Sequence, residues 1–203
     1  MNCDLENMIK GGKIHNKIKE YIKEIIKPEI KLYDLALNIE NRIKEEVEYN
    51  NIEPLKCGIG FPTGLSINDC AAHWTPKINC KRILNKNDVI KIDYGIHING
   101  SIIDSAFTYS FNEKYNNLLE ASQSSTSLAI KLARPDMLLS EIGREIEENM
   151  CSYEIELDNK IHKIKPVRTL CGHEINKYMI HGNKIIPNIN MKDYDKRIES
   201  GEF

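Results

Sequence analysis

A repeated pattern is the feature that most constrains how this chain can fold. The segment KPEIKLYDLALNIENRI, which begins at Lys27, lies over RPDMLLSEIGREIEENM, which begins at Arg134, with matching proline, acidic and apolar positions. After the proline, apolar residues in both segments recur every three or four positions, which predicts an amphipathic helix. Two amphipathic helices that each follow a proline can also match in this way by chance. We interpret the match as a duplicated α/β half, so the order of elements should begin again in the second half.

The repeat also creates an expectation about the end of the chain. In the first half, NKNDVIKIDYG leads into a strand-rich run, and IESGEF at the end of the second half places Gly201–Phe203 over Asn87–Val89. We therefore expect one domain over residues 1–203, with a first half at about 13–110. The second half, at about 111–203, should stop as its own hairpin begins.

Period and turn residues predict the individual elements. Helices are expected up to Lys27-Pro28, from Leu35 to Val47, from Leu118 to Leu132 and from Ile142 to Met150. A β-hairpin is expected over Asp88–Ser110 and a shorter one over EIELDNKIHKIK, whereas GIGFPTG is expected to be a loop because of its Gly and Pro content. The expected fold class is therefore α/β (α+β).

The long hairpin brings two aspartates together. An Asn-Gly turn at positions 99–100 favours the type I′ geometry and fixes the register of both strands. Counting back from the turn, Asp93 faces Ala106, and Asp104 faces Gly95. The two aspartates then lie diagonally on one face, with Cβ atoms roughly 7 to 8 Å apart or less. The small residues beside them leave the point between the carboxylates open.

Two readings of this carboxylate pair are possible. Two buried like charges at such range force one to keep its proton unless a cation lies between them. A pair of divalent metals satisfies both, because carboxylate oxygens can ligate singly, doubly or as a bridge. Alternatively, both aspartates lie on the hydrated face of an antiparallel sheet. The hairpin alone leaves both readings open.

The histidines supply candidate partners for the carboxylates. Three occupy Gly-marked loops or strand ends, where functional groups are often presented: His73, His173 and His181. Taken singly, a histidine in such a position is more often a structural or surface residue than a functional one. We expect His15, in a Lys-rich helix, and His162, in a polar hairpin, to be solvated. His97 lies on the same face of the strand as Asp93, but four residues carry it roughly 13 Å away, too far to bind the same metal ion.

The bulk composition is that of an ordinary globular protein. The 203 residues are 41% apolar and 29% charged, with a formal net charge of −2, which gives no global attraction to nucleic acid or anionic membrane. We interpret the basic stretch at the beginning of the chain as a solvated helix face. The six cysteines form no CxxC pair, and the sequence leads us to expect neither a secretory leader nor a long apolar span. Free thiols in a reducing cytoplasm are therefore expected.

Three long motifs in a fixed order resemble one family. GIGFPTGLSINDCAAHWTP, DVIKIDYGIHINGSIIDSAFTYSF and KPVRTLCGHEINKYMIHGNKIIP resemble segments of the type 2 methionine aminopeptidases, and the likeness runs from about Lys13 to Phe203. The resemblance implies the pita-bread fold with two pseudo-symmetric halves, the second incomplete here. It also implies that Asp93, Asp104 and His173 bind two divalent metal ions, without distinguishing Co, Mn, Zn or Fe.

The same resemblance implies an activity. It is the removal of the initiator methionine from nascent proteins whose second residue is small, by a hydroxide that the two metals activate. His73 and His181 match residues that contact substrate or transition state, and Phe61, Gly64 and Ile180 match the methionine side-chain pocket. The implied partners are nascent polypeptide N-termini and the ribosome, with no membrane and no specific nucleic acid. The implied full-length state is a cytoplasmic monomer.

The sequence departs from that family in ways that leave alternatives open. Two further glutamate ligands are expected beyond Phe203, so we expect a fragment or a truncated gene whose 203 residues alone bind metal weakly and have little or no activity. Cys171 also stands where the family usually has asparagine. A non-catalytic pita-bread protein that binds RNA, the ribosome or a protein partner is one alternative. A proline-specific dipeptidase of the same fold is another.

Overall fold

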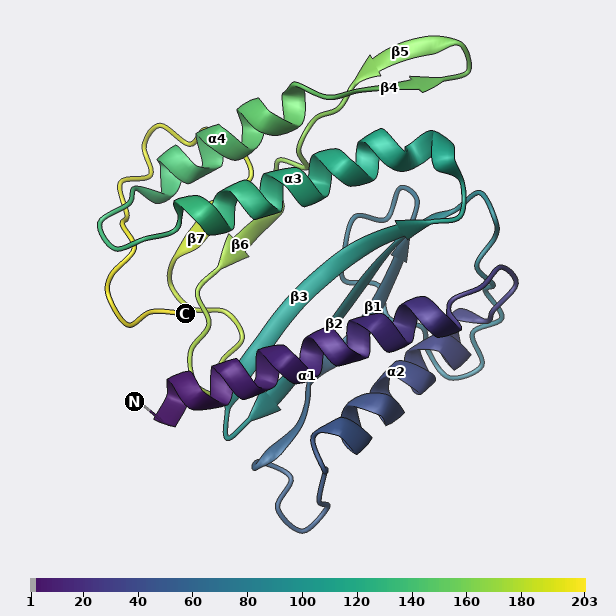
Figure 1. Ribbon diagram of the computed structural model, residues 1–203, viewed down its shortest axis with the longest axis vertical. Coiled ribbons are helices and arrows are strands. Elements are labelled where there is room, and N and C mark those ends of the chain that lie inside the picture. The colour runs from purple at the N-terminus through teal and green to yellow at the C-terminus, as the bar shows by residue number, and fades with distance from the viewer. Residues whose placement is uncertain (1–2) are drawn as a thin grey trace. The chain divides into compact units, whose positions relative to one another are not determined.

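The computed structural model describes residues 3–203, and they divide into two compact units (Figure 1). The first unit comprises the described residues up to Phe111 together with Asn176–Ile180. The second comprises Asn112–Ile175 and His181–Phe203. None of the described helices combines the length and apolarity needed to cross a bilayer.

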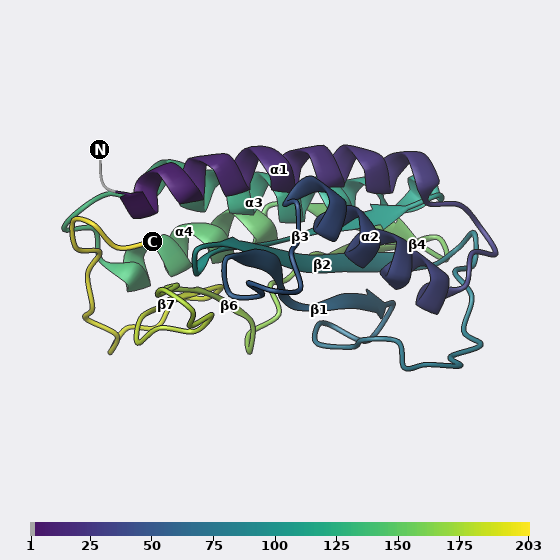
Figure 2. The same cartoon turned by 90° about the horizontal axis from the view of Figure 1, so that it is seen from below.

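The first unit is an antiparallel sheet covered on one face by two helices (Figures 1 and 2). The helices are α1 (Cys3–Ile25) and α2 (Leu32–Glu46), and the strands are β1 (Cys57–Ile67), β2 (Val89–Ile98) and β3 (Ser101–Ser110). The sheet order is β1-β2-β3. Helix α1 ends shortly before Pro28 because a proline disfavours helical geometry in the residue before it. The expected helices and long hairpin are therefore present.

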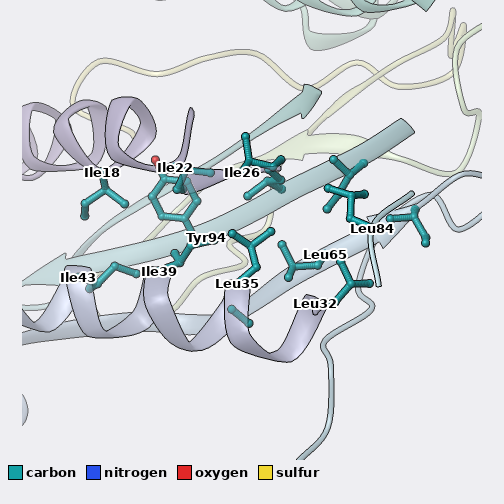
Figure 3. Packing of buried hydrophobic residues seen from close by; sticks show 14 of the residues in the cluster. Ile18, Ile22, Ile26, Leu32, Leu35, Ile39, Ile43, Leu65, Leu84 and Tyr94 are labelled. Atoms are coloured by element: carbon teal, nitrogen blue, oxygen red, sulfur yellow. The ribbon is translucent and has the colours of Figure 1, made fainter. Parts of the chain in front are cut away.

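Apolar stripes on both helices form the core of this unit (Figure 3). Ile18 and Ile22 of α1, and Leu35 and Ile39 of α2, are completely buried. They pack in one cluster with inward-facing strand residues such as Tyr94. Burial of each such aliphatic side chain contributes about 1.5 to 3 kcal/mol, so this stripe holds the helices on the sheet.

The expectation that His15 is solvated is wrong. Its side chain is 5% exposed, and its ring stacks on that of Tyr94 with centroids 4.1 Å apart. The His15 Nε2–H donates to the Tyr94 carbonyl at 3.0 Å, and the Tyr94 hydroxyl donates to the His15 carbonyl at 2.9 Å. His15 lies three residues before Ile18 and shares its buried face, so helical periodicity outweighs the surrounding lysines.

The predicted hairpin register is confirmed. Ile98 pairs with Ser101, Asp93 with Ala106, and Gly95 with Asp104. Both turn residues, at positions 99–100, have positive φ angles of 50° and 83°, as a type I′ turn requires.

The expectation that GIGFPTG is a loop is wrong, because these residues lie within strand β1. The pairing of β1 with β2 shifts register between Ile59 and Phe61 and again between Phe61 and Gly64. These irregularities accommodate Pro62, and β1 is an edge strand, where a proline is tolerated.

The second unit repeats the helix pair and adds two small antiparallel strand pairs. A 3₁₀ turn η1 (Glu113–Tyr115) precedes α3 (Asn116–Leu132) and α4 (Leu139–Cys151), which pack against each other. The predicted short hairpin is β4 (Glu154–Leu157) with β5 (Lys160–Lys163), and all of β5, His162 included, is exposed as expected. Strands β6 (Cys171–His173) and β7 (Ile185–Pro187) form a further antiparallel pair.

The duplication is visible in backbone geometry. Glu29 and Asp136 occupy matching positions before α2 and α4, and both have positive φ, at 67° and 69°. The Glu29 N–H donates to the Leu84 carbonyl at 2.7 Å, and the Asp136 N–H donates to the Ile198 carbonyl at 2.9 Å. The two halves therefore enter their second helices through the same hydrogen-bonded turn.

A side-chain contact extends the repeat to its last residues. The Asp88 carboxylate accepts the Asn85 N–H at 2.8 Å, and the Glu202 carboxylate accepts the Glu199 N–H at 2.7 Å. This equivalence is the register that the sequence comparison of Gly201–Phe203 with Asn87–Val89 predicts. Five cysteines are free thiols, and the Cys3 side chain lies outside the described residues.

Candidate active site

The two aspartates occupy the sheet face opposite the helices. Ile92 and Tyr94, on either side of Asp93 in β2, are completely buried in the helix-facing core. Side chains alternate along a strand, so Asp93 faces the other way, and the confirmed register puts Asp104 on the same face. Both aspartates are half-buried. The structure therefore brings this predicted pair together.

Strand β1 brings two further predicted residues to the same place. Gly64 pairs with Asp93, and a Cβ atom at Gly64 would lie 3.4 Å from the Asp93 Cβ and 3.9 Å from its Oδ2. Phe61 pairs with Gly95, and its ring occupies the space that a Gly95 side chain would take. An aromatic ring and an open backbone position thus flank the carboxylates.

His73 lies in the loop that follows β1. It is exposed and has a positive φ of 62°. The loop folds back on β1, because the Leu65 N–H donates to the Trp74 carbonyl at 2.8 Å and the Trp74 N–H donates to the Ser66 hydroxyl at 3.2 Å. This connection ties His73 to the part of β1 that carries Gly64.

Ile180 belongs to the first unit through the segment Asn176–Ile180. The segment is anchored on the hairpin turn by Tyr178, whose N–H donates to the Gly100 carbonyl at 2.9 Å and whose hydroxyl donates to the Leu55 carbonyl at 3.0 Å. Ile180 follows this anchor by two residues and is half-buried.

His97 does not join the carboxylates. Its ring lies beside that of Tyr178, with centroids 6.2 Å apart, at the turn end of the hairpin. Burial lowers the pKa of His97, so the ring stays neutral at physiological pH.

His173 and His181 form a pair within the second unit. Their ring centroids are 4.3 Å apart at an angle of 65°. The His173 Nδ1 lies 3.3 Å from the Glu174 carbonyl, which can only accept, so this contact requires the proton on Nδ1. That tautomer puts the ring lone pair on Nε2, the arrangement common in metal-binding histidines.

The donor set fits a divalent metal. Carboxylate oxygens and an imidazole nitrogen are suitable ligands for Mn, Fe, Co and Zn. Among the described residues, neither unit by itself contains three or more His, Cys, Asp or Glu side chains grouped to hold a metal ion. The candidate ligands are distributed as two carboxylates in the first unit and a histidine pair in the second.

The chain belongs to metallopeptidase family M24, whose sequence profile matches residues 6–203. Methionine aminopeptidase 2 of Komagataella phaffii is 44% identical over 194 residues, which cover 95% of this chain and 42% of that protein. Methionine aminopeptidase 2 of Saccharomyces cerevisiae is 46% identical over 198 residues, which cover 96% and 47% respectively. The chain thus spans about half the length of the curated relatives it matches.

The fold is also that of solved members of this family. A methionine aminopeptidase from Rickettsia prowazekii superposes with a TM-score of 0.79 at 21% identity, covering 100% of this chain and 77% of that one. The predicted pita-bread fold with mixed helices and strands is confirmed by this likeness.

Proposed function

We propose that the protein is a methionine aminopeptidase that removes the initiator methionine from nascent proteins whose second residue is small. The observation that carries this proposal is the half-buried Asp93–Asp104 pair, set on one sheet face beside Phe61 and Gly64. The 44–46% identity to proteins named methionine aminopeptidase 2 supports the same activity.

Asp93, Asp104 and His173 would hold the metal, which we propose to be a pair of divalent ions drawn from Co, Mn, Zn or Fe. When bound, such ions supply a hydroxide at neutral pH and polarise the scissile carbonyl. The two carboxylates offset the ionic charge, and the Glu174 carbonyl, by accepting the Nδ1 proton of His173, would keep that ring ready to ligate through Nε2.

The remaining candidate residues would bind and orient the substrate. Phe61, Gly64 and Ile180 would enclose the methionine side chain, since an apolar pocket suits an unbranched thioether. His73 and His181 would hydrogen-bond the peptide near the scissile bond and move protons there. We further propose that the protein acts in the cytoplasm as a monomer, on chains that emerge from the ribosome.

A peptidase assay on Met-Ala-Ser tests the proposal. The full-length protein should release methionine in a metal-dependent way, and Asp104→Asn should reduce its kcat/KM by a factor of roughly 100 or more, because one carboxylate ligand loses its charge. Asp34→Asn, an exposed residue of α2, is the matched control and should leave the rate unchanged. Full activity in Asp104→Asn, or after thorough chelation, would refute the peptidase assignment. Metal analysis that finds no bound divalent ion would instead favour a binding protein.

A further inference from the structure

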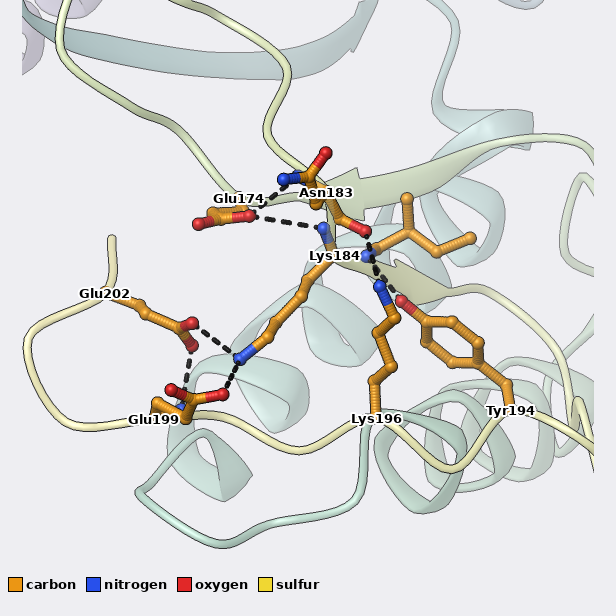
Figure 4. A network of polar contacts seen from close by, with 8 residues as sticks. Glu174, Asn183, Lys184, Tyr194, Lys196, Glu199 and Glu202 are labelled. Carbon is orange, nitrogen blue, oxygen red and sulfur yellow. Dashed lines mark hydrogen bonds and ion pairs between the residues drawn. The ribbon is translucent and has the colours of Figure 1, made fainter.

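The Glu174 carboxylate lies in a close-fitting seat in the second unit (Figure 4). Its Oε2 accepts the Asn183 N–H at 2.7 Å and the Lys184 N–H at 3.2 Å. Gly182 makes this approach possible, because a Cβ atom there would overlap the carboxylate. The seat therefore consists of two backbone N–H donors and the space left by the absence of a side chain at Gly182. It suits a side chain at position 174 that accepts hydrogen bonds.

The backbone of Glu174 is held at the same place. Its N–H donates to the Lys184 carbonyl at 2.9 Å, and its carbonyl accepts the Gly182 N–H at 2.7 Å. These bonds continue the ladder in which His173 pairs with Ile185. The side chain and the backbone of Glu174 thus both form hydrogen bonds that connect the end of β6 to the three residues that precede β7.

The two histidines belong to the two segments that these hydrogen bonds connect. His173 directly precedes Glu174 in the chain, and His181 directly precedes Gly182. Their rings meet at 4.3 Å although seven residues separate them in the sequence. The Glu174 carboxylate is a side-chain link between the two segments that carry them.

A second layer of contacts supports the receiving side of the seat. The Lys184 ammonium binds the carboxylates of Glu199 at 2.8 Å and Glu202 at 2.5 Å (Figure 4). The Ile185 N–H donates to the Tyr194 hydroxyl at 3.0 Å. The backbone donors that hold Glu174 are therefore fixed by their own neighbours and do not depend on Glu174 alone.

We propose that Glu174 is a positioning residue that sets the distance and angle between His173 and His181. This inference rests on the proposed function, in which one histidine binds metal and the other contacts substrate. Without the carboxylate, two backbone N–H groups lose their acceptor, and the loop ahead of β7 is held to Glu174 by the two backbone hydrogen bonds alone. A misplacement of about 1 Å at a catalytic group can cost roughly 100-fold in rate.

Nuclear Overhauser contacts between labelled histidine rings test the geometry without any activity. A cross-peak between the ring protons of His173 and His181 should be present in the unaltered chain and in Glu174→Gln, whose amide oxygen can still accept both N–H groups. It should be lost or strongly weakened in Glu174→Ala. Glu156→Gln, at an exposed residue of β4 in the same unit, is the matched control. An undiminished cross-peak in Glu174→Ala would overturn the proposal.

Kinetic measurements on the full-length protein separate positioning from general stability. Glu174→Ala should lower kcat by roughly 10- to 100-fold at a temperature where it is fully folded, and Glu174→Gln should recover most of the rate. In a His181→Ala background the same change should cost less than threefold, because residues that act through each other are not additive. Fully additive losses would overturn the role of Glu174. Absence of peptidase activity in the unaltered full-length protein would instead refute the proposed function, and the nuclear Overhauser test of the geometry would remain valid.

Discussion

Replacement of Gly95 by alanine tests the packing beside the carboxylates most directly. Gly95 is the strand partner of both Phe61 and Asp104, so it lies at the centre of the candidate site. An added Cβ would overlap the edge of the Phe61 ring, which must turn away to make room. The backbone at Gly95 has no positive φ, so alanine is compatible with the main chain and the whole cost lies in that ring.

The magnitude follows from two opposing effects. Forcing a methyl group into occupied space costs about 1 to 3 kcal/mol. Against this, alanine reduces the freedom of the unfolded chain and stabilises by about 0.4 to 1 kcal/mol where its backbone fits. Gly95→Ala should therefore lower the free energy of unfolding by about 1 to 2 kcal/mol. In a Phe61→Ala background, where the space is empty, the same change should be neutral or slightly stabilising.

Urea unfolding of the four proteins in this double-mutant cycle measures the coupling. A coupling free energy of about 1 to 3 kcal/mol, equal to the steric cost alone, is expected with an unchanged m-value. Gly12→Ala is a matched control, because a Cβ there meets no atom within 4 Å, and it should stabilise α1 by about 0.5 to 1 kcal/mol. If Gly95→Ala and Phe61→Ala prove additive within about 0.5 kcal/mol, the steric account of this glycine is refuted. In the peptidase assay, the displaced ring should raise KM more than it lowers kcat.

Three other perturbations follow from the first unit. Burial lowers the pKa of His15 in the folded state, so the unfolded chain binds more protons as the pH falls. The free energy of unfolding should therefore decrease below about pH 6.5. In His15→Gln, the urea midpoint should depend less on pH over this window. Gly100→Ala combines a positive φ with overlap of the Tyr178 ring, so it should destabilise by about 1 to 3 kcal/mol in urea, and a loss under 0.5 kcal/mol would contradict the turn geometry. Leu35→Ala removes a completely buried side chain and should cost about 2 to 5 kcal/mol by the same measurement.

Much of the candidate site could be predicted because its determinants are local. The two-residue turn at positions 99–100 sets the register of β2 and β3, so the shared face of Asp93 and Asp104 follows from counting along the strands. Helical periodicity places the buried faces of α2 and α4, and the pattern match aligns Glu29 with Asp136, where the structure shows the same positive φ in both halves.

Other features could not be predicted because they depend on residues far apart in the chain. Strand β1 forms despite its glycines and Pro62 because β2 provides a neighbour to pair with. His15 is buried because Tyr94, 79 residues away, provides a flat ring and a carbonyl acceptor for it. Helical periodicity places His15 on the apolar stripe of α1, so its burial could have been predicted from the sequence.

The sequence by itself determined the duplicated α/β design, the hairpin register and the identity of the carboxylate pair, because these depend on turn chemistry, side-chain period and residue type over short stretches. Only the tertiary structure decided that Phe61 fills the space above Gly95, and that the Glu174 carboxylate is seated on the backbone of Asn183 and Lys184. Each of those contacts joins two segments that are separate in the sequence. Their geometry is set by the packing of the whole unit rather than by the conformational preferences of short stretches of sequence.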